Sequence, residues 1–344
     1  MGTIQLLDCT LRDGGYCNDC RFGLGNQRRM TAGLAAAGVE IIECGFLLDH
    51  VLYHPDVTRF TSPEQIGAIL PGVPGPDSPQ YVVLADYGRY DFDRLPPQSE
   101  TPIQGIRVAF RKKDRLAALA ACRTVRDKGY RVFVQPMVSA GYTDGEFLDL
   151  IRRVNALEPY AFYIVDSFGT IRRQDLLRLF ALAEHNLDPA IWIGFHPHNN
   201  LQLAFANAQA LVEQHSPRNL IVDSSVYGMG RGAGNLNTEL WARYLNDQAG
   251  GRYRMGPLLD LMDGVVLDFY RRSPWGYGAA YYLSASHQAH PDYGGYLEEK
   301  KTLTAREMEE IFARMDPEQK MTFDRGYIEE LYQTYQAARK GRAL

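Results

Sequence analysis

The stretch Ile191-Trp-Ile-Gly-Phe-His-Pro-His-Asn-Asn200 is an apolar run that ends in two histidines one residue apart. Because side chains alternate along an extended chain, His196 and His198 are expected to project from the same face of a strand. Two neutral imidazoles directed at one point can bind a divalent metal ion. The stretch therefore predicts a strand with candidate metal ligands at its carboxyl end, and a surface His-x-His turn is the alternative.

Strand and helix signals alternate on both sides of this stretch. Apolar, β-rich runs lie at residues 4–8, 39–44, 81–85, 106–110, 131–136, 162–165, 191–195 and 220–222. Segments of helical periodicity lie at residues 27–37, 63–70, 115–128, 146–157, 174–185, 201–213 and 236–246. The third connection, residues 86–105, is proline-rich and is expected to be mostly loop. This order predicts an α/β fold, a parallel (β/α)8 TIM barrel.

Two local signals support the barrel. Thr143-Asp-Gly-Glu146 has the pattern of a capping box at the start of the helical segment 146–157. An open doubly wound sheet is the alternative, but the glycine-rich segment 228–234 follows the last strand rather than an early one. We assign residues 1–250 to the barrel and residues 251–344 to a C-terminal, mainly helical extension that covers the barrel mouth.

The composition excludes several classes of protein. The chain has 344 residues, of which 45% are hydrophobic, and a net charge of -4, which gives no electrostatic footprint for nucleic acid. No window contains the roughly eighteen uninterrupted apolar residues of a membrane span, and the N-terminus lacks the features of a signal peptide. The five cysteines are odd in number and suit a reducing compartment. A cytoplasmic protein is expected.

Polar side chains gather where seven of the eight predicted strands end. These ends supply Asp8, Arg12, Asp13, Glu43, Asp86, Gln135, Asp166, Ser167, His196, His198, Asp223, Ser224 and Ser225. Asp86 and Asp223 are equally well explained as caps of the following helices. Asp13 would face His196 and His198, and such a set leaves positions open, as in catalytic metal sites. Mn²⁺, Mg²⁺, Co²⁺ or Zn²⁺ would fit, and Mn²⁺ or Mg²⁺ is favoured.

The chain resembles the DRE-TIM metallolyases, the HMG-CoA lyase-like superfamily. The resemblance is carried in order by Leu7-Asp-Cys-Thr-Leu-Arg-Asp-Gly-Gly15, Ile42-Glu-Cys-Gly-Phe46, His196-Pro-His-Asn-Asn200 and Gly228-Met-Gly-Arg-Gly-Ala-Gly-Asn235. The superfamily includes 3-hydroxy-3-methylglutaryl-CoA lyase, isopropylmalate and homocitrate synthases, and 4-hydroxy-2-oxovalerate aldolase, whose branch this chain is most similar to. The residues that give the superfamily its name correspond here to Asp13, Arg12 and Glu43.

The resemblance implies chemistry at a carbon–carbon bond next to a 2-oxo acid. A substrate such as pyruvate would chelate the metal ion, which would act as a Lewis acid while an enolate forms. Arg12 would contact the substrate and brace the developing charge, and Glu43 would orient Arg12 or a metal-bound water. Asn235 would contact the metal, its water or the substrate, and Gln135 is a further candidate substrate contact.

The chain departs from the aldolase branch at the proton carrier. Where those aldolases have a histidine three residues after the aspartate, this chain has Tyr16. Tyr16 could act with a depressed pKa or as a hydrogen-bond donor; otherwise a metal-bound water or a C-terminal group must act. His290, expected to titrate near neutrality, is the strongest C-terminal candidate. Tyr277, with Trp275 and Tyr281, is a candidate substrate contact, and aromatic packing is the alternative.

Three functions are consistent with these residues. The leading one is retro-aldol cleavage, or the reverse addition, of a 4-hydroxy-2-oxo acid. The alternatives are a Claisen-type synthase that joins an acyl-CoA to a 2-oxo acid, and a non-catalytic barrel scaffold, against which the intact Arg12, Asp13 and Glu43 argue. The expected partners are a small 2-oxo acid substrate, a second copy in a homodimer, and an aldehyde-consuming enzyme. Neither nucleic acid nor a membrane is expected as a partner.

Overall fold

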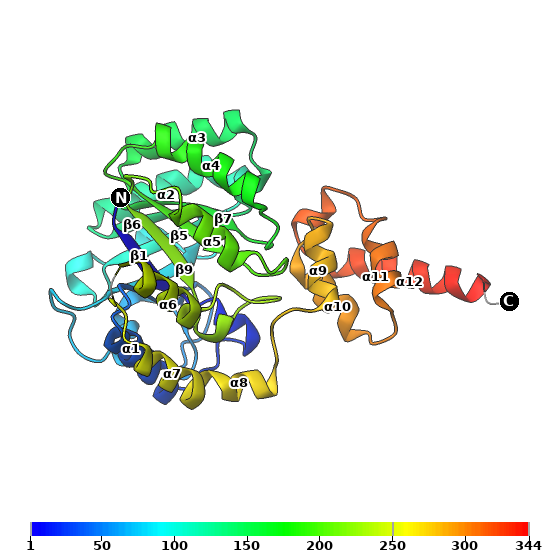
Figure 1. The fold of residues 1–344 in the computed structure, drawn as a ribbon, viewed down its shortest axis with the longest axis horizontal. Helices are drawn as coiled ribbons and strands as arrows, with labels where there is room; N and C mark the ends of the chain where they lie inside the picture. The colour runs from blue at the N-terminus through cyan, green and yellow to red at the C-terminus, as the bar shows by residue number, and fades with distance from the viewer. Residues whose placement is uncertain (1, 250, 343–344) are drawn as a thin grey trace.

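The barrel strands are apolar on both faces, as expected for parallel strands that are covered by helices and packed inside a closed sheet. In the computed structural model, which describes residues 2–249 and 251–342, parallel strands form a barrel surrounded by helices (Figure 1). The barrel strands are β1 (Ile4–Asp8), β2 (Ile41–Leu47), β4 (Gln80–Asp86), β5 (Gly105–Phe110), β6 (Arg131–Pro136), β7 (Ala161–Asp166), β8 (Trp192–Pro197) and β9 (Leu220–Ser224). They pair in this order, and β9 pairs with β1 to close the barrel. The predicted (β/α)8 fold is confirmed.

The outer layer consists of helices that connect the strands. They are α1 (Leu24–Ala37), α2 (Arg115–Asp127), α3 (Asp144–Leu157), α4 (Arg173–Asn186), α5 (Ala204–Val212) and α6 (Thr238–Ala249). The expected capping box is present, since the Thr143 hydroxyl accepts a hydrogen bond from the Glu146 N–H and the Glu146 carboxylate accepts one from the Thr143 N–H. The helical segments predicted between these strands therefore form α-helices, apart from the second.

The second connection differs from its expected α-helix. Residues Pro63–Ile69 form a 3₁₀-helix, and the two-residue strand β3 (Arg59–Phe60) precedes it. Pro63 fits the first turn of a helix, but Gly67 inside the segment and Pro71 just after it weaken a longer α-helix. The third connection is mostly loop with short 3₁₀ turns, as its proline content predicts.

Inward-facing side chains divide the barrel interior into an apolar and a polar part. The buried apolar cluster contains Leu7, Cys9, Ile41, Val82, Phe133, Ala161, Tyr163, Val165 and Ile221. Gly194 leaves room for Tyr163, because a Cβ at this position would lie 2.3 Å from the tyrosine ring. Since side chains alternate along a strand, inward positions two residues further on carry polar groups: Glu43, Gln135, His196 and Asp223. The carboxyl end of the barrel is thus the polar end.

The C-terminal region consists of two parts. Helices α7 (Met255–Leu261) and α8 (Leu267–Arg272), together with the π-helical turn Met262–Val266 between them, bury Leu258, Val266 and Phe269 in the core of the barrel. The helical lobe, residues 279–342, contains α9 (Ala279–Ser286), α10 (Pro291–Glu299), α11 (Ala305–Phe312) and α12 (Arg325–Arg342) around a core of its own. We therefore propose a domain boundary near residue 276, later than the boundary at residue 250 expected from the sequence.

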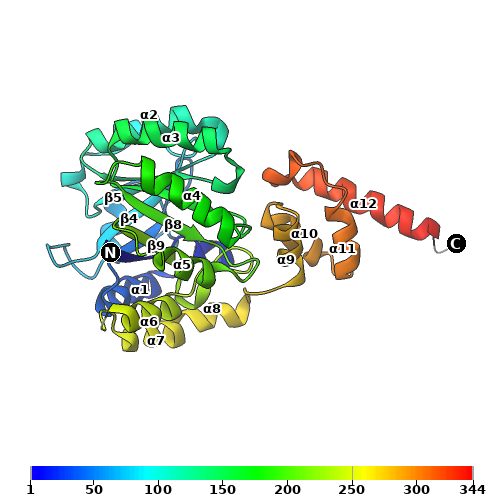
Figure 2. The same ribbon diagram turned by 45° about the horizontal axis from the view of Figure 1, so that its top comes forward.

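The helical lobe lies beyond the carboxyl ends of the barrel strands (Figures 1 and 2). It contacts the loops there through His290, whose ring lies 5.4 Å from that of Phe168. This placement brings the lobe to the polar end of the barrel. Within residues 2–249 and 251–342, none of the helices is long and apolar enough to cross a membrane.

Candidate metal centre

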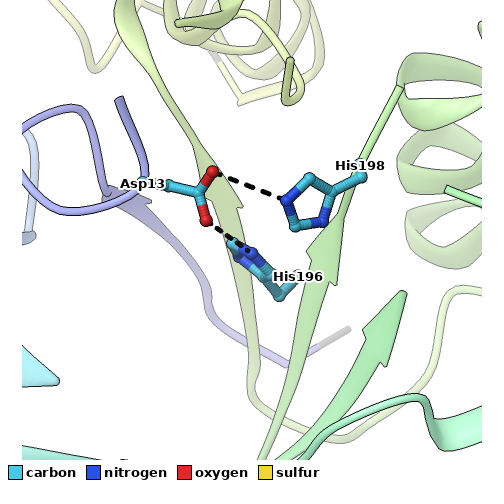
Figure 3. Close-up of side chains that lie close together, drawn as sticks. All are labelled: Asp13, His196 and His198. Carbon is cyan, nitrogen blue, oxygen red and sulfur yellow. Dashed lines mark ion pairs between the residues drawn. The ribbon is translucent and has the colours of Figure 1, made fainter. Parts of the chain in front are cut away.

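Asp13, His196 and His198 come together at the carboxyl end of the barrel (Figure 3). Asp13 follows β1, and the two histidines lie at the end of β8, where their alternate positions place both rings on the inward face. Each side chain is buried and offers a ligand atom within 4.8 Å of the other two. The two carboxylate oxygens of Asp13 lie 3.6 Å from Nε2 of His196 and 3.5 Å from Nε2 of His198. This set of one oxygen and two nitrogens suits a divalent metal ion.

The second nitrogen of each histidine is held by a fixed partner. Nδ1 of His198 lies 3.0 Å from the carbonyl oxygen of Asp166, and because a carbonyl only accepts, this nitrogen carries the proton. Nδ1 of His196 lies 2.8 Å from the carboxylate of Asp223. Such partners leave Nε2 free to bind a metal and fix the orientation of the ring. Both Nε2 atoms accordingly face Asp13.

Asn235 provides an independent test of whether a ligand fits here. Its side-chain amide donates to Asp13 at 3.2 Å and to the carbonyl of Met229 at 3.1 Å. Its Oδ1 atom is buried and has no hydrogen-bond partner among the described residues. A buried acceptor without a partner costs free energy, so a cation or its water beside Asn235 would satisfy it. The residues present therefore fit a divalent metal ion.

Arg12 and Glu43 flank this group as a buried pair. Nε of Arg12 donates to Glu43 at 2.7 Å, and Nη1 contacts the Asp13 carboxylate. Nη2 lies 3.5 Å from Nε2 of His196, so the guanidinium borders the same space as the metal ligands. Burial works against ionised Asp13, but Arg12 and His198 hold the pKa of Asp13 well below its ordinary value. The carboxylate is thus ionised and available as a ligand.

Arg107 extends the network inside the barrel and was not anticipated. It lies on β5, is fully buried, and forms ion pairs with Glu43 and Asp223. The signal in the sequence was a single arginine at an inward position of an apolar strand. Asp223, which the sequence left open as a helix cap, instead joins Arg107 to His196.

Two candidate substrate contacts lie differently from their expected places. Gln135 is buried inside the barrel, and its amide oxygen, oriented toward Arg107, accepts from Nε at 2.7 Å and from Nη2 at 2.6 Å. Its oxygen is therefore engaged within the protein. Tyr277 is 66% exposed, and the adjacent Trp275 and Tyr281, rather than Tyr277, line the cavity at the barrel mouth.

That cavity, of about 480 Å³, lies between the barrel mouth and the helical lobe. It is lined by Tyr16, Cys17, Gly230, Arg231, Gly232, Ser273, Pro274, Trp275, Tyr281, Asp292, Gly295, Tyr296, Glu299, Phe323 and Arg325. The backbone N–H of Arg231 donates to Asp13 at 3.3 Å, so one loop borders both the cavity and the metal ligands. The Arg231 side chain pairs with Asp292 of the lobe at 3.6 Å. Sequence reasoning did not single out Arg231.

The candidate proton carriers are both uncharged near neutral pH. Desolvation raises the pKa of Tyr16, although 43% of the residue is exposed, and the Arg231 guanidinium, 3.9 Å from the ring centre, opposes this shift without reversing it. Tyr16 is thus a hydrogen-bond donor rather than a base of depressed pKa. Burial also lowers the pKa of His290 to about 4, and its Nδ1 accepts from the Asp292 N–H at 3.3 Å. The expected titration of His290 near neutrality is therefore wrong.

Comparisons with known proteins agree with this geometry. The HMGL-like family model matches residues 108–263. The chain is 29% identical to 4-hydroxy-2-oxovalerate aldolase 2 of Nocardia farcinica over 77% of this chain and 75% of that protein. It is 26% identical to an oxaloacetate decarboxylase of Mycobacterium tuberculosis over 79% and 78%. The N-terminal domain of a putative aldolase from Bacteroides vulgatus superposes with a TM-score of 0.71 at 20% identity, covering 88% of this chain and 98% of that one. This chain is an enzyme that contains an HMGL-like domain at residues 108–263, and over about three quarters of its length it is similar to 4-hydroxy-2-oxovalerate aldolases.

Proposed function

We propose that this enzyme is a divalent-metal-dependent aldolase that cleaves a 4-hydroxy-2-oxo acid, or forms one in reverse, through an enolate of the 2-oxo acid product. The observation that carries this proposal is the buried group of Asp13, His196 and His198 with Arg12 against it. The relatives of this chain that are named 4-hydroxy-2-oxovalerate aldolase support it. When bound, the metal would supply Lewis-acid stabilisation of charge on the keto oxygen.

The charge of the site supports the binding of a cation. Arg12 and Arg107 face three carboxylates, those of Asp13, Glu43 and Asp223. With His196 and His198 neutral, as metal ligands must be, this connected network has one excess negative charge, which a buried site balances by binding a cation. We propose Mn²⁺ or Mg²⁺, because a carboxylate, an amide oxygen and imidazoles are ligands that accept such ions.

The protein groups perform the remaining steps. Arg12, held by Glu43, would donate hydrogen bonds to the oxygen on which negative charge develops, because a fixed guanidinium needs no reorganisation during the reaction. Tyr16, which keeps its proton, would donate to the substrate hydroxyl or alkoxide rather than remove a proton. His290 is uncharged near neutral pH, and because its Nδ1 accepts from the Asp292 N–H, its Nε2 would donate a hydrogen bond. Asn235 would hold the metal, its water or the substrate through the unpaired Oδ1.

We further propose that the substrate extends from the metal centre into the cavity lined by Trp275 and Tyr281. A cytoplasmic location, a homodimer and an aldehyde-consuming partner enzyme stay predictions from the sequence.

The Claisen-type synthase can be distinguished from the aldolase by its products. The aldolase releases pyruvate from a synthetic 4-hydroxy-2-oxo acid, whereas the synthase releases a free thiol from acetyl-CoA in the presence of a 2-oxo acid.

The direct test replaces the proposed ligands. We expect Asp13→Asn and His198→Ala to lose bound metal and to abolish deuterium exchange into the methyl group of pyruvate in heavy water. The matched controls are Asp127→Asn and His185→Ala, because these side chains are 60% and 75% exposed. Both controls should keep wild-type Mn²⁺ affinity and exchange. Undiminished exchange in both ligand variants would show that the metal and enolate mechanism is wrong.

A further inference from the structure

Arg107 is a fully buried cation inside the barrel, on the strand β5. Its ion-pair partners are Glu43 and Asp223, and neither is one of the three proposed metal ligands. A charge without solvent is tolerated only when it is well paired, so this arginine is retained at a cost in desolvation. A barrel interior filled with apolar side chains would avoid that cost. Packing alone therefore does not explain an arginine at this position.

Each carboxylate beside Arg107 serves a second partner. Oε2 of Glu43 lies 2.7 Å from Nη1 of Arg107 and accepts from Nε of Arg12 at the same distance. Oδ2 of Asp223 accepts from Nη2 of Arg107 and lies 2.8 Å from Nδ1 of His196. One guanidinium thus touches both the carboxylate that holds Arg12 and the carboxylate that holds a metal ligand.

Arg107 itself is fixed from its remaining sides. The amide oxygen of Gln135 accepts from Nε and Nη2, and the ring of Tyr163 lies 5.0 Å from the guanidinium carbon. The Tyr163 hydroxyl also donates to the other oxygen of Asp223 at 3.1 Å. A planar guanidinium held on several edges keeps one orientation, which an ammonium group with a single point charge does not.

We infer that Arg107 is a positioning residue that aligns two parts of the active site at once: the metal ligand His196 through Asp223, and Arg12 through Glu43. Its ion-pair partners are not the proposed metal ligands, and it does not line the cavity at the barrel mouth, so its effect is carried by the two carboxylates. The inference rests on the proposed function for its metal and catalytic readouts. Partners of this kind usually change metal affinity or activity by about 10- to 100-fold when they are altered.

The first experiment compares Arg107→Lys with the wild type. Lysine keeps the charge but cannot pair with both carboxylates in a fixed geometry. We expect the Kd for Mn²⁺, measured by titration calorimetry, to rise by about 10-fold or more. At saturating Mn²⁺ we expect kcat for deuterium exchange into pyruvate to fall by a similar factor, about 10-fold, with a smaller change in KM.

Arg218→Lys is the matched control. Arg218 is another buried arginine, but its guanidinium donates to the backbone carbonyls of Leu187, Asp188 and Ile191, away from the metal ligands. This variant should lose stability and keep the wild-type Kd for Mn²⁺. Wild-type Kd and kcat in Arg107→Lys would overturn the inference, as would equal effects in the two variants.

Double-mutant cycles separate positioning from general destabilisation. The effect of Arg107→Lys on the Kd for Mn²⁺ should largely disappear in an Asp223→Asn background, and its effect on kcat should shrink in a Glu43→Gln background. Fully additive effects in both cycles would contradict the inference. Should Arg107→Lys fail to fold, Gln135→Met leaves both ion pairs and removes the acceptor that holds Nε. It is expected to shift Kd and kcat in the same direction, and unchanged values would overturn the inference.

The two proposals fail in different ways. If the wild type binds Mn²⁺ no better than Asp13→Asn does, the proposed metal site is wrong. The role of Arg107 is then decided by a crystal structure of Arg107→Lys, in which undisplaced Asp223 and Glu43 side chains would overturn it. If the wild type binds Mn²⁺ and Arg107→Lys binds it equally well, only the inference about Arg107 fails.

Discussion

Asp8 ends β1 and Asp13 lies five residues later, in the loop after this strand, yet their pKa values move in opposite directions. Burial raises the pKa of Asp8 to about 6, because its partners are the hydroxyl of Thr238 and the hydroxyl and N–H of Thr10, none of which is charged. Asp13 is buried as well, but the adjacent Arg12 keeps its pKa low. The charge of the nearest donor therefore decides which carboxylate is ready to bind a cation.

Asp8 gives a prediction for stability. Because its pKa is raised in the folded state, the unfolded chain ionises first as the pH rises above about 4. Unfolding then becomes easier up to about pH 6, and the loss stays constant above that pH. Asp8→Asn should remove this loss, which amounts to about 3 kcal/mol on the scale of 1.4 kcal/mol per pKa unit.

The measurement is urea unfolding of the wild type and Asp8→Asn between pH 4 and pH 8. The wild type should lose stability relative to the variant between pH 4 and pH 6 and run parallel to it above pH 6. Asp127→Asn, with its exposed side chain, should show no such difference. Parallel curves for the wild type and Asp8→Asn across the whole range would contradict the raised pKa.

Helices α3 and α11 begin with the same hydrogen-bonded box, one on the barrel and one on the helical lobe. In α3 the Glu146 N–H donates to the Thr143 hydroxyl at 3.3 Å, and the Thr143 N–H donates to Glu146 at 2.9 Å. Thr304 and Glu307 repeat the pattern in α11 at 3.3 Å and 2.7 Å. Each box satisfies backbone donors that the first turn leaves unpaired.

Thr143→Ala and Thr304→Ala should each lower the free energy of unfolding by about 1 kcal/mol. Thr143→Ala should lower the stability of the barrel, and Thr304→Ala should lower the stability of the lobe. The two effects should be separate because the two helices belong to separate cores. Hydrogen exchange of the helix amides distinguishes the two. Equal loss of protection in both helices from either variant would contradict separate cores.

The chain as a whole consists of a barrel that carries the three candidate metal ligands and a helical lobe that lies beyond the carboxyl ends of the barrel strands (Figure 1). The lobe has its own buried core, which includes Tyr293, Phe312 and Ile328. The barrel core includes Leu150 and the helices α7 and α8. Metal binding and lobe stability are therefore expected to be separable.

Ile328→Ala should destabilise the lobe by about 2–5 kcal/mol, since it empties a fully buried position. Calorimetry should show the lobe unfolding at a lower temperature while the barrel transition stays in place. The Kd for Mn²⁺ should stay at the wild-type value, because the ligands lie on the barrel. Leu150→Ala, also fully buried, is the matched change in the barrel and should shift the other transition. A single transition that both variants shift equally would contradict this division.

Hydrophobic patterning was sufficient to predict the barrel. The strands at residues 4–8 and 131–136 begin and end as expected, because clear apolar runs are bounded by turn residues. The prediction of an α-helix in the second connection was wrong, since Gly67 and Pro71 favour a tighter, shorter 3₁₀-helix. The later domain boundary that we propose could not be read from periodicity, because α7 and α8 pack on the barrel rather than on the lobe.

The site was predictable where strand order alone determines proximity. Asp13, His196 and His198 follow strands whose carboxyl ends meet at one end of a closed parallel barrel, so their approach follows from the fold. The roles of Arg107 and Arg231 depend instead on contacts between strands and loops far apart in the chain. A local sequence pattern predicts the direction in which a side chain points, but it does not predict which other side chain it contacts. Those contacts are determined by the closure of the barrel and by its packing against the lobe.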